Sequence, residues 1–203
     1  MNAILNVLEQ FGINAAALPH GNGHINHTFL VDSNPRVILQ RINTSIFKNP
    51  AEVMGNIMAV TAYLREKIAA AGGDPARETM TFLTTKEGLP YYKTAEGDYW
   101  RACYFVEDTV CLEVAKNPED FAEVAHAFGR FQKMLAEFPA DRLAETIERF
   151  HDTPNRFAQL EEAIAADRAG RVASVEAEIA LCRKFQKYAS LIADGIADGT
   201  VPL

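Results

Sequence analysis

A glycine-bearing turn near the N-terminus constrains the fold of this chain more than any other feature. The turn, Gly21-Asn22-Gly23, separates a short apolar segment at 15–18 from the β-branched and apolar run 27–32. A second run of this kind, 36–42, follows the turn-forming segment 32–35. Asn-Gly is a strong hairpin signal because both residues tolerate a positive φ. The sequence therefore predicts an antiparallel sheet built around this turn.

The same turn has the composition of a phosphate-binding loop. Its backbone N–H groups can close over phosphates while a side chain from a following strand reaches them. Gly23 has no Cβ to block that approach. Each polar side chain of the turn can equally be an ordinary turn or strand residue. The candidate phosphate contacts are Gly21, Asn22, Gly23, His24, Asn26 and Thr28.

Two neighbouring side chains at the end of the second run, Gln40 and Arg41, compete for the role of phosphate ligand. Side chains alternate along a strand, so only one of them can face a nucleotide. Register favours Gln40, which carries no charge, and charge favours Arg41. Glu52, in the first turn of the helix predicted after Pro50, is the candidate acid partner of the strand cation. An acid there also stabilises the helix dipole without any role in binding.

The hydrophobic pattern divides the chain into a mixed half and a helical half. Helices are predicted at 2–11 and 50–71, and further strands at 79–85, 89–94 and 98–106. Beyond residue 111 the pattern is helical only, from 117 onward and at 140–150, 154–168 and 173–194. The prediction is an α+β fold, with an N-terminal lobe at 1–106 and the first helices of a second lobe at 107–203.

The helix predicted after Asn117 carries a broad apolar stripe. A stripe of this width fits the central helix of a larger lobe, which is normally covered on several sides. Where that cover is incomplete, exposed apolar surface favours self-association. The stripe consists of Phe121, Val124, Phe128, Phe131 and Leu135.

Composition narrows the class of protein. The net charge of −7 argues against a general nucleic-acid binder, which needs a basic face. The three cysteines include no C-x-x-C pair, which indicates reduced thiols and no zinc site. The first residues lack the basic and apolar regions of a signal peptide, and no window approaches the ~18 apolar residues of a membrane span. We therefore expect a cytoplasmic protein with neither nucleic acid nor membrane as a partner.

Three blocks of sequence resemble the aminoglycoside phosphotransferase/choline kinase-like superfamily, and within it the N-acetylhexosamine 1-kinases. They are G-N-G-H-I-N-H-T-F-L-V at 21–31, V-I-L-Q-R-I-N at 37–43 and F-H-D-T-P-N-R at 150–156. The resemblance covers most of residues 15–160. It implies a protein-kinase-like fold, ATP and Mg²⁺ as cofactors, and transfer of a phosphoryl group to the anomeric hydroxyl of an N-acetylhexosamine.

The resemblance also implies roles for residues outside the turn. The strand end at Tyr104, Phe105 and Glu107 is expected to hold the adenine through backbone groups. The sugar is expected to contact His151, Asp152, Asn155 and Arg156, although Asp152 before Thr-Pro also fits a helix N-cap.

The catalytic loop of such kinases, H-x-D-x-x-x-x-N, supplies a base and a metal ligand. None of the five histidines opens this loop. We therefore assign no catalytic or metal-binding residue, expect the Mg²⁺ ligands beyond Leu203, and expect this chain to be inactive alone. Kinases for homoserine, choline or an aminoglycoside are alternatives, as is a complete, catalytically inactive nucleotide-binding or interaction module.

Overall fold

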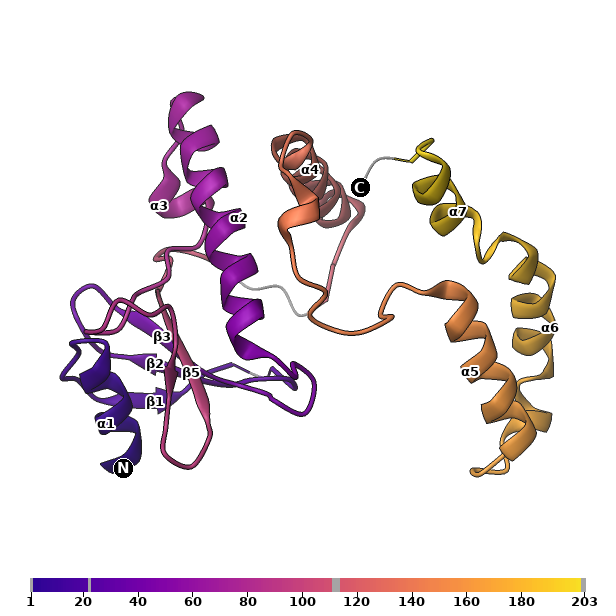
Figure 1. Cartoon of the computed structure of the whole chain (residues 1–203), viewed down its shortest axis with the longest axis horizontal. Coiled ribbons are helices and arrows are strands. Elements are labelled where there is room, and N and C mark those ends of the chain that lie inside the picture. The colour runs from indigo at the N-terminus through magenta and orange to yellow at the C-terminus, as the bar shows by residue number, and fades with distance from the viewer. Residues whose placement is uncertain (1, 22, 111–113, 202–203) are drawn as a thin grey trace. The chain divides into compact units, whose positions relative to one another are not determined.

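The structure is a computed structural model that describes residues 2–21, 23–110 and 114–201 (Figure 1). It divides into two compact units, Met1–Thr146 and Ile147–Leu203. The division of the chain into lobes at 1–106 and 107–203 stays a prediction. No helix of the described residues is both long and apolar enough to cross a bilayer.

The first unit is built on a five-stranded antiparallel sheet with strand order β1-β2-β3-β5-β4. The expected hairpin around the glycine turn is formed, with Pro19 opposite Phe29. The central strand β3 pairs Leu39 with Ala102 of β5. The strands are β1 Ala17–Pro19, β2 His27–Val31, β3 Val37–Ile42, β4 Tyr92–Lys93 and β5 Tyr99–Tyr104.

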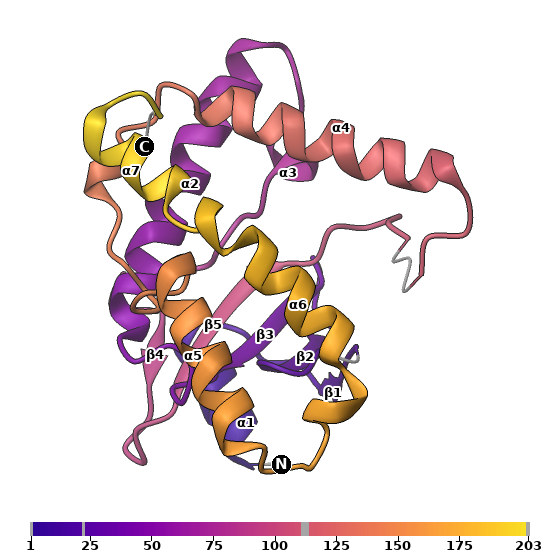
Figure 2. The same ribbon diagram turned by 90° about the vertical axis from the view of Figure 1, so that its right-hand side faces the viewer.

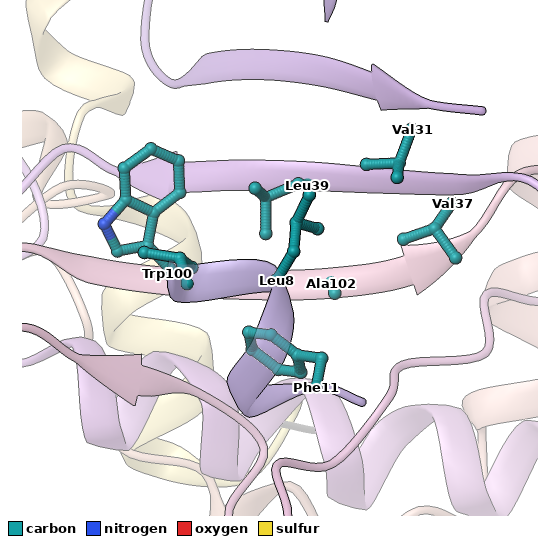
Figure 3. Close-up of a cluster of buried hydrophobic side chains, with 8 residues drawn as sticks. Leu8, Phe11, Val31, Val37, Leu39, Trp100 and Ala102 are labelled. Carbon is teal, nitrogen blue, oxygen red and sulfur yellow. The ribbon is translucent and has the colours of Figure 1, made fainter. Parts of the chain in front are cut away.

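Helix α1 (Asn2–Gln10) covers one face of this sheet. Leu8 of α1, Leu39 of β3 and Ala102 of β5 are each fully buried in a single apolar cluster (Figure 3). Burial of such side chains is the main favourable contribution to folding. The buried members of the cluster are Val7, Leu8, Phe11, Val31, Val37, Leu39, Trp100 and Ala102.

Helix α2 (Pro50–Ala70) begins at Pro50, as predicted, because proline lacks only an N–H that a helix start leaves unbonded. Its residues Asn56 and Ile57 line a pocket together with Arg101 of β5. Since Arg101 alternates with Trp100 and Ala102 along β5, α2 lies on the sheet face opposite α1. The unit also contains α3 (Pro75–Glu78), α4 (Pro118–Leu135) and the short 3-10 helix Ala140–Arg142.

The second unit is helical. Helices α5 (Thr153–Ala166) and α6 (Glu176–Phe185) run in opposite directions (Figure 2). A bidentate ion pair between Arg183 and Glu161 links them. Two short 3-10 helices, Val172–Ser174 and Gln186–Tyr188, and α7 (Leu191–Asp198) complete the unit.

Four predicted elements differ from the structure. The strand predicted at 89–94 is shortened to the two residues of β4, Tyr92–Lys93. The strand predicted at 79–85 forms only an isolated bridge, Phe82 to Cys103, because β4 occupies the rest of that side of β5. The helix predicted at 140–150 is reduced to Ala140–Arg142. The helix predicted at 173–194 is split into α6 and α7 by a 3-10 turn.

Candidate functional site

The glycine turn is held by backbone and side-chain bonds at its base. The His20 N–H donates to the Thr28 carbonyl at 2.9 Å, and the Asn26 side chain accepts from the backbone N–H of Asn43 at 3.0 Å. Gly21 has a φ of 74°, a conformation that side chains disfavour. Gly23 and His24 are exposed, and a Cβ added at Gly23 would meet open space. Asn22 lies outside the described residues.

The turn lies beside the end of β5. The His20 ring meets the Phe105 ring edge to face, with centroids 6.1 Å apart. This contact brings together two segments that are more than eighty residues apart in the sequence, and both were expected at the nucleotide site. Sequence reasoning did not assign His20 to the site.

The segment after β5 is fixed by Arg36. Its carbonyl accepts from the Phe105 N–H at 2.9 Å, and its guanidinium lies over the Phe105 ring at 4.5 Å from the centroid. The guanidinium also donates through Nε to the Glu107 carboxylate at 2.8 Å. The Phe105 N–H is therefore occupied, and Glu107 serves as an ion-pair partner. Tyr104 is 40% exposed.

The ion pair with Arg36 makes a testable contribution to acid stability. The hydrogen bond from Arg36 lowers the pKa of the Glu107 carboxyl, and its charge acts in the same direction. A lowered carboxyl pKa stabilises the folded state above the unfolded value of ~4.3, and this gain disappears as the pH falls through the folded pKa. We expect the melting temperature of Glu107→Gln to be lower than that of the wild type at pH 7 and equal to it at pH 3.

Thermal unfolding of both proteins between pH 3 and pH 7 measures this difference. Glu87→Gln is the matched control, because Glu87 is exposed in the turn before Leu89 and makes no ion pair with the described residues. A Glu107→Gln deficit that is the same at both pH values would contradict the assignment.

Gln40 and Arg41 lie on opposite faces of β3. Arg41 is on the face that α1 covers, and its Nη1 meets Asp98 at 3.3 Å. Gln40 is on the α2 face, where its Nε2 donates to the Thr28 hydroxyl at 3.0 Å. Glu52 is exposed and forms no ion pair with the described residues, so the expected pair between Glu52 and the strand cation is not formed.

Arg101 is the residue that sequence reasoning missed. Its Nε donates to the side-chain oxygen Oε1 of Gln40 at 3.0 Å, so the Arg101 side chain lies on the same sheet face as that of Gln40 and belongs to the same hydrogen-bond network. A signal was present in the sequence, because Arg101 is the only charged residue in the otherwise apolar and aromatic strand Tyr99–Tyr104.

The substrate candidates at 151–156 form a helix start. Asp152 is the N-cap of α5: its carboxylate accepts from the Asn155 N–H at 2.8 Å and from the Arg149 guanidinium. These bonds, led by that from Asn155, lower the pKa of Asp152. Arg156 donates to the Phe150 carbonyl at 3.1 Å, and the exposed His151 ring packs against the Phe150 ring. The capping alternative for Asp152 is therefore confirmed, and the sugar-binding role stays a prediction.

The second unit contains a separate hollow of about 670 Å³ between α5 and α6. None of the four substrate candidates lines it. The described residues hold no group of three or more His, Cys, Asp or Glu side chains arranged to bind a metal ion.

Comparison with known proteins identifies the fold. No protein-family model matches the sequence. An aminoglycoside phosphotransferase from Alicyclobacillus acidocaldarius matches 80% of this chain with 18% identity and a TM-score of 0.50. A spectinomycin phosphotransferase, APH(9)-Ia, in complex with ADP and spectinomycin matches 92% of the chain with 10% identity and a TM-score of 0.48, over 57% of its own length.

The chain spans 43% of the length of the first of these structures. The similarity to it is a similarity of fold. The chain thus has the predicted α+β, protein-kinase-like fold, in the form found in an aminoglycoside phosphotransferase.

Proposed function

We propose that this chain is the nucleotide-binding portion of an ATP-dependent small-molecule kinase of the aminoglycoside phosphotransferase/choline kinase-like superfamily. The observation that carries this proposal is the contact between the glycine turn and the end of β5, made by His20 and Phe105. In a kinase fold these two segments border the nucleotide, with the turn over the phosphates and the strand end at the adenine. The sequence blocks at 21–31 and 37–43 support the same assignment.

The phosphoryl acceptor we propose is the anomeric hydroxyl of an N-acetylhexosamine. The support is the block Phe150–Arg156, in which His151 and Asn155 carry side chains that do not form the helix cap. The chain contains no H-x-D-x-x-x-x-N loop, so its own contribution is binding and positioning. ATP would supply the transferable phosphoryl group, and Mg²⁺ would neutralise its phosphates.

Nucleotide binding is testable with the chain as it stands. We expect isothermal titration calorimetry to detect binding of both ADP and adenosine. Gly21→Val should weaken ADP binding by roughly fivefold or more. A side chain costs ~1–2 kcal/mol at this positive φ, so the turn of the free variant relaxes and must return to the strained conformation when ADP binds. Gly88→Val is the matched control, since Gly88 has a φ of 80°, open space around it and a place in another turn.

Equal loss of ADP affinity in the Gly21 and Gly88 variants would contradict a role for the glycine turn. Failure of the wild type to bind either ligand would contradict the proposed function itself. The acceptor is tested separately by saturation-transfer NMR with N-acetylglucosamine, choline and homoserine. A response to choline or homoserine alone would replace the sugar as the proposed acceptor.

A further inference from the structure

A row of polar side chains crosses the sheet on the α2 face. Thr28, Gln40 and Arg101 are neighbours on β2, β3 and β5. Gln40 joins the other two through its side-chain amide: Nε2 donates to the Thr28 hydroxyl, and Oε1 accepts from Arg101 Nε, each at 3.0 Å. The row begins one residue after His27, where β2 leaves the glycine turn. Gln40 therefore connects the strand of the turn to the Arg101 guanidinium and fixes the direction of that group.

Arg101 is a cation in a mainly apolar environment. It lines a pocket of about 310 Å³ with side chains of α2 and with Met80 and Phe82. The guanidinium carbon lies 5.6 Å from the centre of the Phe82 ring. Burial lowers the pKa of this guanidinium. Removing a charge from water costs free energy unless the charge is paired.

No acid of the described residues forms an ion pair with Arg101. Two polar side chains of α2 border the same pocket, and both have partners of their own. Asn56 exchanges two hydrogen bonds with the backbone of Ala144, at 2.8 and 2.9 Å, and the Thr61 hydroxyl donates to the Ile57 carbonyl at 2.7 Å. The Nε of Arg101 bonds Gln40, and no residue in the described part of the chain accepts a hydrogen bond from its two Nη amino groups, which can therefore donate to an external anion. A planar guanidinium suits a phosphate, because it donates two parallel hydrogen bonds.

Arg41, the cation that the sequence favoured by charge, is placed differently. It lies on the α1 face of the sheet, and Asp98 already neutralises it. On the α2 face, the cation near the turn is Arg101 of β5, which has no acid partner among the described residues.

We propose that Arg101 is the residue that binds the nucleotide phosphates, and that Gln40 is a positioning residue that orients it. This inference rests on the proposed function. On β3, register favoured Gln40 as the phosphate ligand and charge favoured Arg41. The inference accounts for both, because Gln40 occupies the phosphate-facing position and Arg101, its neighbour on β5, supplies the positive charge.

Affinities for ADP and adenosine, measured by calorimetry, separate phosphate contacts from base contacts. Arg101→Met should weaken ADP binding by roughly 10- to 100-fold, the range for hydrogen bonds to charged groups, and leave adenosine binding unchanged. Gln40→Leu should give a smaller loss with the same selectivity. Arg41→Met is the matched control and should bind both ligands like the wild type.

A second measurement needs no variant. Phenylglyoxal modifies accessible guanidinium groups, and mass spectrometry reports the labelling of each arginine. ADP should protect Arg101 of the wild-type chain and leave Arg41 labelling unchanged, whereas adenosine should protect neither. If Arg101→Met does not fold, this measurement alone tests whether Arg101 binds the phosphates.

The inference is overturned if Arg101→Met binds ADP like the wild type, if Arg41→Met is the variant that loses ADP, or if ADP leaves Arg101 labelling unchanged. In each of these cases ADP still binds, so the proposed function stands. Absence of binding by both ligands contradicts the proposed function first.

Discussion

Leu39→Ala is expected to destabilise the first unit by about 2–5 kcal/mol, the range for a leucine truncated to alanine in a packed core. Leu39 is fully buried on the central strand β3, between the helix α1 and the neighbouring strands (Figure 3). The substitution removes apolar contacts and leaves a cavity that the surrounding strands cannot collapse, because both sides of β3 are paired.

Urea unfolding followed by tryptophan fluorescence measures this loss directly. The only tryptophan, Trp100, belongs to the same buried cluster, so its emission reports on the unfolding of this core. Leu18→Ala on β1 is the matched control, because the same atoms are removed from a side chain that is 69% exposed. We expect that control to stay within about 0.5 kcal/mol of the wild type. Equal effects of the two substitutions would contradict the assigned core.

Self-association through α4 is the second large effect that we expect. Four side chains of its apolar stripe are exposed: Phe121 and Phe128 by 65%, Val124 by 53% and Phe131 by 43%. Their spacing places them on one face of the helix. Burying one phenylalanine is worth ~1.5–3 kcal/mol, so a surface with several exposed aromatic side chains favours association. Leu135, the fifth member, is half-buried.

Sedimentation velocity at micromolar concentration tests this prediction. The wild type should contain dimers or larger species, and Phe121→Ser/Phe128→Ser should weaken the association by at least about a hundredfold. Glu123→Ser/Lys133→Ser is the control, because both side chains are exposed and lie away from the stripe. A wild type that sediments as a compact monomer, or a double phenylalanine variant that behaves like the wild type, would contradict the prediction.

Local signals in the sequence were sufficient to predict most helices and the central strands. Pro50 marks the first residue of α2, and Asn117 and Asp152 cap α4 and α5 through their own side chains. These features act within one helical turn, so the sequence carries them completely. The elements that it mispredicted, at 79–85, 89–94, 140–150 and 173–194, depend on partners that are distant in the sequence or on breaks between short helices.

The sequence by itself also determined that Gln40 and Arg41 face opposite ways, because alternation is a property of any strand. Only the tertiary structure decided which face is which. Packing of α1 against Leu39 and Ala102 assigns Arg41 to the core side, where Asp98 neutralises it. Pairing of β3 with β5 then brings Arg101, sixty-one residues away, into contact with Gln40. This contact depends on the register between β3 and β5, and its place on the α2 face depends on which helix covers each side of the sheet. The residues next to Gln40 in the sequence encode neither.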